Sequence, residues 1–248
     1  MVNVNQVYQT VLYILNKEQR GYLTPAEFNK VATQVQLEIF EQYFEELNQA
    51  LRMPDNDSEY ANRVKNLNEK IGMFETHGVC TTTASPLYSF PDDLHRIGSI
   101  TYKDKLLQEM SRRDYVLINK SPFTKPTESF PAYVLDGLAT PFAPAAPGLK
   151  MDVYPDTISS DLPIFYIRKP LDVVWAYKPN TQGGYVYQEA ADPAAIPNTG
   201  SVQFGLHPTE QVNIILNILM YSGVIIRDQQ IVQTASAMIQ QDTANEKT

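Results

Sequence analysis

A helix end, a turn and a new helix start follow one another between residues 16 and 29. Gly21 can adopt the left-handed conformation that ends many helices. Thr24 can cap the next helix because its hydroxyl accepts from a free backbone N–H, and Pro25 stands where a missing N–H costs nothing. Glu27, three residues after Thr24, completes a capping box. These signals predict two helices joined by a tight turn, and they limit how the rest of the chain can pack.

The two helices differ in how their apolar residues are spaced. The first, over residues 4–19, has one apolar side. The second runs from Pro25 to about Leu51, and its later half carries a second apolar stripe a third of a turn from the first. A surface helix needs only one stripe. Either two elements of the same chain pack against this half of the helix, or one stripe packs inside the chain and the other faces a neighbouring subunit. The candidate interface residues in this stripe are Phe40, Phe44, Leu47 and Leu51.

A third helix is expected over residues 60–74, and the pattern then changes. From residue 79 to 206 short apolar runs alternate with prolines, which is typical of strands joined by turns. A short helix is expected over residues 108–118, after a turn at Lys103-Asp104, and Asp92-Asp93 are typical of a helix start. The predicted strands form an antiparallel sheet folded into a sandwich or small barrel. They cover Ile97–Tyr102, Ala132–Leu135, Leu149–Tyr154, Leu162–Arg168, Val173–Tyr177, Gly184–Gln188 and Ser201–Leu206.

Residues 137–148, GLATPFAPAAPG, are apolar and rich in proline. Such a composition favours an extended arm rather than a helix or a central strand. Apolar surface is costly to leave in water. We therefore expect the arm to lie on another surface, with Phe142 as its candidate contact.

Helical patterns return at Pro208. The residues that follow are apolar almost all round, which predicts a core helix that ends at Gly223. A last helix, capped by Asp228, is expected to about Asp242, with Ile231 and Met238 as candidate contacts on its weak apolar side. The sequence thus predicts an α+β fold. Its helical bundle is built from residues 1–76 and 207–242, with a β-rich domain inserted at 77–206 and a frayed tail at 243–248.

Composition and motifs argue against several classes of function. The net charge is -8, with 20 basic residues against 28 acidic ones, which is unlike the clustered basic charge of a nucleic-acid-binding protein. The sequence has no phosphate-binding glycine motif and no nucleophile elbow. Its three histidines, His77, His95 and His207, lack the spacing of zinc ligands, and Cys80 is the only cysteine. We expect no catalytic site, metal or cofactor, and no membrane span.

Aromatic residues alternate along the β-rich segment at Tyr154, Tyr166, Trp175 and Tyr177. Such a row can form a platform on which sugars or bases stack. It is also typical of the core of a small sheet. The first interpretation makes the chain a carbohydrate- or receptor-binding module, and the second gives these residues no binding role.

Four segments resemble structural proteins of crAss-like and related short-tailed bacteriophages. In chain order they are NKEQRGYLTPAEFNKVATQVQLEIFEQYF, FPDDLHRIGSITY, MDVYPDTISSDLPIFYIRKPLDVVWAY and LHPTEQVNIILNILMYSGVIIRD. The resemblance covers most of the chain, and it lies in the order of several segments rather than in any one motif. It is a resemblance to the ring or adaptor proteins below the portal at the head–tail junction.

The resemblance implies a non-enzymatic virion protein that is made in the bacterial cytoplasm. It implies a closed ring of about twelve copies, bound to the portal protein above and to further ring or tail proteins below. DNA would pass through the channel without specific binding. A ring of this kind needs two different contact surfaces on each subunit. The doubly striped helix, the apolar arm and the neutral C-terminal helix are the features that could supply them.

Overall fold

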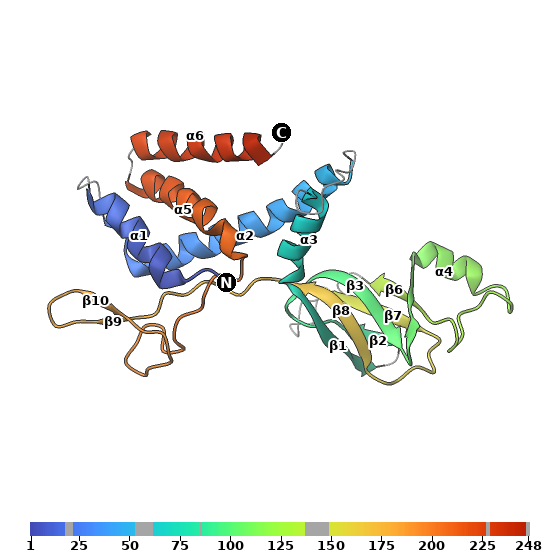
Figure 1. The fold of residues 1–248 in the computed structure, drawn as a ribbon. Coiled ribbons are helices and arrows are strands. Elements are labelled where there is room, and N and C mark those ends of the chain that lie inside the picture. The colour runs from blue at the N-terminus through green and yellow to red at the C-terminus, as the bar shows by residue number, and fades with distance from the viewer. Residues whose placement is uncertain (18–21, 53–61, 85, 137–148, 227–228, 247–248) are drawn as a thin grey trace. The chain divides into compact units, whose positions relative to one another are not determined.

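The computed structural model describes residues 1–17, 22–52, 62–84, 86–136, 149–226 and 229–246 (Figure 1). The chain forms two compact units, one of residues 1–73 with 170–248 and the other of residues 74–169. The fold class is α+β, as the sequence predicts. The insertion differs from the expected 77–206, because residues 170–206 group with the helices and not with the sheet.

The part of the first unit that the structure describes contains five α-helices, and we call this unit the helical unit: α1 (Val4–Lys17), α2 (Pro25–Ala50), α3 (Arg63–Gly72), α5 (Gln211–Ile226) and α6 (Gln229–Glu246). A 3₁₀ turn, η1 (Pro208–Glu210), leads into α5. Helix α5 packs against α1, α2 and α6, and α3 packs on α2. This central place explains why α5 is apolar on most of its sides. The helix also continues through Gly223 to Ile226, so the helix end expected at Gly223 is wrong.

The capping box at the start of α2 forms as the sequence predicts. The hydroxyl of Thr24 accepts from the backbone N–H of Glu27 at 3.4 Å, and the carboxylate of Glu27 accepts from the backbone N–H of Thr24 at 2.9 Å. Two of the free N–H groups of the helix start are thereby satisfied. Phe28, in the first turn, is fully buried. The local signals thus set both where α2 begins and which side of it faces the core.

Residues 170–206 belong to the helical unit but have little regular structure. They contain one hairpin, formed by β9 (Tyr177–Pro179) and β10 (Tyr185–Tyr187). Strand β10 lies within the predicted strand Gly184–Gln188. The strands predicted at Val173–Tyr177 and Ser201–Leu206 are reduced mostly to isolated bridges, such as Val174 with Val202. Side chains of α2 replace the missing strand pairing. Gln36 donates to the carbonyl of Leu171 at 2.7 Å and accepts from the backbone N–H of Gly205 at 2.8 Å.

The described residues of the second unit, which we call the sheet unit, form eight strands and one short helix, α4 (Arg112–Ile118). The strands are β1 (Glu75–Ala84), β2 (Leu87–Ser89), β3 (Leu94–Tyr102), β4 (Lys105–Leu106), β5 (Gln108–Met110), β6 (Ala132–Asp136), β7 (Lys150–Tyr154) and β8 (Leu162–Arg168). Their order in the sheet is β4-β3-β8-β1-β2-β7-β6-β5. All pairs are antiparallel except β5 with β6, so the sheet is mixed rather than purely antiparallel.

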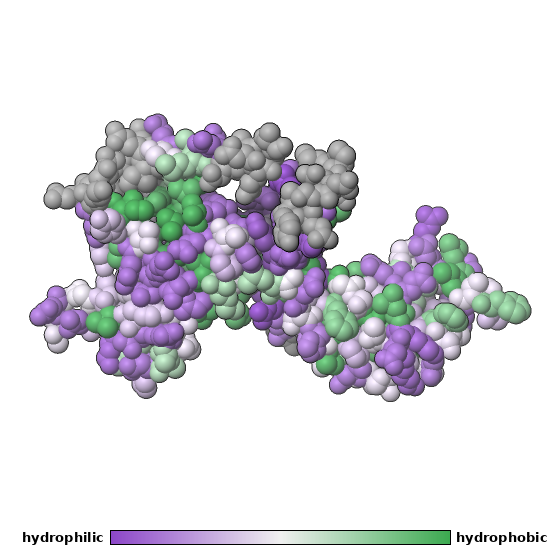
Figure 2. Space-filling view, in the orientation of Figure 1, coloured by the Kyte–Doolittle hydropathy of each residue, from purple (hydrophilic) through white to green (hydrophobic). Residues whose placement is uncertain are grey.

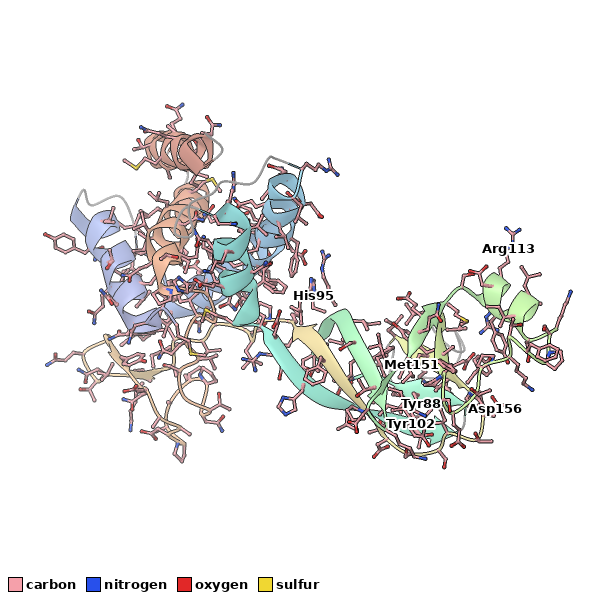
Figure 3. All side chains as sticks on the ribbon, turned by 45° about the vertical axis from the view of Figure 1, so that its right-hand side comes forward. Tyr88, His95, Tyr102, Arg113, Met151 and Asp156 are labelled. Carbon is pink, nitrogen blue, oxygen red and sulfur yellow. The ribbon has the colours of Figure 1, made fainter. Side chains whose placement is uncertain are left out.

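The sheet is nearly closed on itself. Strands β4 and β5 lie at its two ends, yet only Leu107 separates them in the chain, so the sheet must curl until these ends meet. Leu107 donates its N–H to the carbonyl of Ile100, and its side chain is buried. The interior is filled by apolar side chains from both halves of the sheet, among them Tyr88, Tyr102 and Met151 (Figure 3).

Several local predictions differ from the structure of the sheet unit. β1 and β2 were not among the predicted strands, although β1 is central and pairs with both β8 and β2. Polar and threonine-rich β1 lacks the apolar alternation that marks a strand. Asp92-Asp93 lie in a turn before β3 and start no helix. The turn at Lys103-Asp104 is confirmed, and both residues have positive φ angles of 46° and 62°, as tight hairpins require.

Candidate interaction surfaces

The predicted interface residues of α2 are divided between the core and the surface. Phe40 and Phe44 are buried and meet edge to face, with ring centroids 5.2 Å apart. Leu47 is half-buried, whereas Leu51 is 63% exposed. The first half of the stripe therefore packs inside the helical unit, which is the first of the two alternatives. The other end of the stripe, at Leu51, is exposed.

The remaining candidates lie on α6 and on the proline-rich segment. Met238 is 48% exposed on α6, while Ala235 of the same helix is buried. Phe142, with the whole predicted arm 137–148, lies outside the described residues. The side chain of Ile231 also lies outside them, although the backbone there is helical.

One side of α2 forms a shallow acidic groove of about 430 Å³. Between Gln34 and Gln49 the helix carries four glutamates and no lysine or arginine. Helical spacing places them along one side, and Figure 2 shows hydrophilic residues over this part of the helical unit. The groove is lined by Gln34, Leu37, Glu38, Glu41, Glu45 and Gln49, among others. We call this surface the α2 groove.

Two hydrogen bonds hold the carboxylate of Glu38 in the α2 groove. The hydroxyl of Tyr221, on α5, donates to it at 2.6 Å, and the side-chain amide of Gln34 donates to it at 2.9 Å. The bond to Glu38, together with burial, raises the pKa of Tyr221 to about 12. Glu46 lies about two turns further along α2. Its carboxylate accepts from the side-chain amide of Gln42 at 2.7 Å and lies 3.9 Å from the guanidinium of Arg63. Glu41 and Glu45 are exposed.

The sheet unit exposes apolar side chains around α4, which has no buried residue. Figure 1 shows α4 at one side of the sheet unit. The largest exposed fractions in this region are those of Phe123 at 98% and Phe130 at 81%, with Val116 and Leu117 just over half exposed. Three exposed cations, Arg113, Lys120 and Lys125, are interspersed among them. We call this surface, made of these seven residues, the α4 tip.

Specific contacts fix α4 to the sheet. The ring of Tyr115 stacks on that of Tyr154, with centroids 3.9 Å apart and planes 16° apart. Arg112 forms an ion pair of 3.1 Å with Asp152, and Ser111 caps the helix by accepting from the backbone N–H of Asp114. Arg113 faces away from these contacts (Figure 3). The α4 tip is thus held in place while its apolar side chains stay in water. The sequence analysed above does not predict this surface, although the adjacent apolar residues Val116 and Leu117 are a signal of it.

Two residues of the aromatic row, Tyr166 and Trp175, are buried, and Tyr154 and Tyr177 are half-buried. Trp175 is 4% exposed, and its ring lies 4.4 Å from that of Tyr8 and 5.9 Å from that of Tyr177. Tyr166 is buried and donates to Asp93 at 2.7 Å, while Tyr154 stacks under α4. The face of Trp175 is therefore covered by its own chain. These residues follow the second interpretation, in which they pack a core rather than bind a sugar.

The remaining reactive side chains do not form a cluster. Cys80 is buried in the sheet, and burial raises the pKa of its thiol to about 12, which keeps it protonated at neutral pH. His77 and His95 belong to the sheet unit, and His207 precedes η1 in the helical unit. Within the described residues, no group of three or more His, Cys, Asp or Glu side chains could hold a metal ion.

A scan against models of protein families found no match for this chain, and a search of curated proteins found none either. Among the described helices, none combines the length and the apolar character needed to cross a membrane. The observations that bear on function are therefore the surfaces described above.

Proposed function

We propose that this chain is a structural subunit of a ring at the head–tail junction of a short-tailed, crAss-like bacteriophage. The subunit acts by assembly and carries out no chemistry. Copies of it surround the channel below the portal protein and contact further ring or tail proteins. The resemblance of four segments to such proteins supports this proposal, and so does a surface that a monomer would leave uncovered.

The α4 tip is the observation that carries the proposal. Phe123 is 98% exposed and Phe130, seven residues later in the chain, is 81% exposed, and exposed charged residues flank both in the sequence. Exposed apolar patches with charged residues around them mark contacts between proteins. Val116 and Leu117 of the tip lie on a helix that stacking and an ion pair hold to the sheet. Leu51 and Met238 supply further exposed apolar contacts on the helical unit.

In this proposal the five helices of the helical unit form one bundle, and the bundle and the sheet unit make different contacts around the ring. A ring closes when each copy offers one surface to the copy before it and another to the copy after it. The net charge of -8 suits a channel wall past which DNA moves, because like charges do not hold the phosphate backbone. The protein is accordingly assigned to the virion, after synthesis in the bacterial cytoplasm.

Electron microscopy of the purified chain, alone and mixed with the portal protein of the same phage, tests this function. We expect ring-shaped particles with one rotational symmetry in at least one of the two samples. A variant with Phe123→Ser and Phe130→Ser should form fewer rings while keeping the far-ultraviolet circular dichroism of the original chain. Particles without rotational symmetry in both samples would contradict the proposal.

A further inference from the structure

We propose that the α4 tip of one copy docks into the α2 groove of the next copy, as the head-to-tail contact of the assembly. This inference rests on the proposed function for its setting, a ring of identical chains. The two surfaces that meet differ in charge and in shape. The α2 groove of one copy is occupied by the α4 tip of a second copy of this chain.

Charge is the first reason for this match. Residues 103–125, which include α4, carry six Lys or Arg residues against three Asp or Glu residues, in a chain whose net charge is -8. This is the opposite sign to the stretch Gln34–Gln49, which has four glutamates and no cation. Complementary charges steer two surfaces together and fix their register. The α4 tip and the α2 groove thus carry opposite charges, as two surfaces that bind each other do.

Shape and apolar content are the second reason. The α4 tip carries Phe123, Val116 and Leu117, each more than half exposed. The α2 groove is concave, has a volume of about 430 Å³, and contains the half-buried side chain of Leu37 among its glutamates. That volume lies in the roughly 300–1,000 Å³ range of concave binding sites and can admit a few side chains. An apolar centre with charged residues around it is the usual layout of a protein–protein contact.

The chemistry of the tip favours a protein over DNA as its partner. Binding to the phosphate backbone needs lysine and arginine, but it makes no use of exposed phenylalanine and leucine side chains. Arg113, Lys120 and Lys125 are too few for the long basic stripe that marks a DNA surface. The same three cations are enough to pair with the glutamates of one groove. In an identical neighbour, the side chains of Glu41 and Glu45 are both exposed.

Reversing the charge on each surface tests the contact. One variant carries Arg113→Glu and Lys120→Glu, which makes the tip acidic. A second carries Glu41→Lys and Glu45→Lys, which makes the groove basic. A control carries Lys30→Glu and Lys65→Glu, two exposed helix residues outside both surfaces. Circular dichroism establishes that each variant is folded, and sedimentation velocity measures its assembly alone and in equal mixtures.

We expect each reversed variant alone to assemble at least tenfold more weakly than the original chain, because like charges then face each other. An equal mixture of the two should assemble again. The acidic tip of the first variant meets the basic groove of the second, and the unchanged basic tip of the second meets the unchanged acidic groove of the first. The control should assemble as the original chain does. Recovery in the mixture is the outcome that only a direct tip-to-groove contact produces.

Three other outcomes would overturn the contact, and they differ in what they mean for the ring. If the original chain forms rings and both reversed variants do so equally well, the contact is wrong and the ring proposal stands. If the variants fail and their mixture does not recover, while a duplex DNA probe binds the original tip and not its acidic variant, the partner of the tip is DNA. If the original chain stays monomeric alone and with the portal protein, both proposals fail.

Discussion

The indole N–H of Trp175 donates a hydrogen bond of 3.0 Å to the side-chain oxygen of Asn5, which lies 170 residues earlier in the chain. This bond joins the segment 170–206 to α1. The backbone N–H of Trp175 also donates to Asn29 of α2 at 2.8 Å. Trp175 therefore ties the irregular segment to two helices, which is a physical reason for that segment to belong to the helical unit.

Trp175→Ala should destabilise the protein by about 3–5 kcal/mol, the usual cost of removing a large buried aromatic side chain. Trp175 is the only tryptophan, so urea unfolding should be followed by circular dichroism rather than fluorescence. Asn5→Ala should cost about 1–3 kcal/mol by leaving the indole N–H without its acceptor. Val186→Ala, at a half-exposed position of β10, is the control and should cost less than about 1 kcal/mol. An unfolding midpoint of Trp175→Ala equal to the original would show that the ring is not a core residue.

Gln36→Leu should cost about 2 kcal/mol or more. The side chain of Gln36 is fully buried and bonds two backbone groups of the segment 170–206, at Leu171 and Gly205. Leucine has a similar size but leaves both backbone groups without partners, and each such group costs about 1–3 kcal/mol. Gln49→Leu, at an exposed position on the same helix, is the matched control. Equal unfolding free energies for the two variants would count against this account of the segment.

The capping box should make the stability of α2 depend on pH. The hydrogen bonds from the side chain and the backbone N–H of Thr24 lower the pKa of Glu27 below its ordinary value of 4.5. The ionised carboxylate is therefore favoured in the folded chain. Its stabilisation is present above about pH 4.5, the unfolded value, and is lost as the pH falls through the lowered pKa.

Glu27→Gln removes this ionisation, so the difference in unfolding free energy between the original and the variant should shrink between pH 6 and pH 3. Glutamine can still accept from the backbone N–H of Thr24, so only the part of the stabilisation that depends on the charge is lost. The difference should be measured by urea unfolding at several pH values. A difference that stays constant across this range, or grows as the pH falls, would contradict the role given to the Glu27 carboxylate.

Cys80 should react with a thiol reagent at pH 8 only after unfolding. The thiol is buried and its pKa is raised to about 12 by that burial, so almost none of it is thiolate in the folded chain. The reaction should become complete within minutes in 6 M guanidinium chloride. Cys80→Ala should leave assembly unchanged, since Cys80 lies in the core of the sheet unit. Rapid reaction of the folded protein would mean that the sheet opens readily at β1.

Local signals in the sequence predicted the helices better than the sheet. The helix start at Thr24, the apolar side of α1 and the apolar α5 all follow from short-range patterns. β1 could not be predicted in this way, because its residues gain their place from pairing with β8 and β2 rather than from apolar alternation. The parallel pair of β5 and β6 likewise depends on the crossover through α4, which no local pattern encodes.

The candidate surface was only partly predictable. The second stripe of α2 was correctly recognised as doubly packed, but Phe40 and Phe44 pack within the helical unit and only Leu51 is exposed. The α4 tip was missed because α4 has seven residues, too few for a helical pattern to show which side faces water. The exposure of Phe123 follows from the loop after α4, whose path is fixed by local hydrogen bonds such as that from Thr124 to the carbonyl of Ile118, and no helical or strand pattern predicts such a path.

The mass of the purified protein in solution tests the central claim most directly. Size-exclusion chromatography with light scattering should be run on the chain alone, on the portal protein alone, and on their mixture. We predict a particle whose mass is a fixed multiple of the 28.0 kDa chain, of about twelve copies, in the first sample or on the portal in the third. A mass of 28.0 kDa for this chain in both samples, at concentrations up to tens of micromolar, would contradict the account.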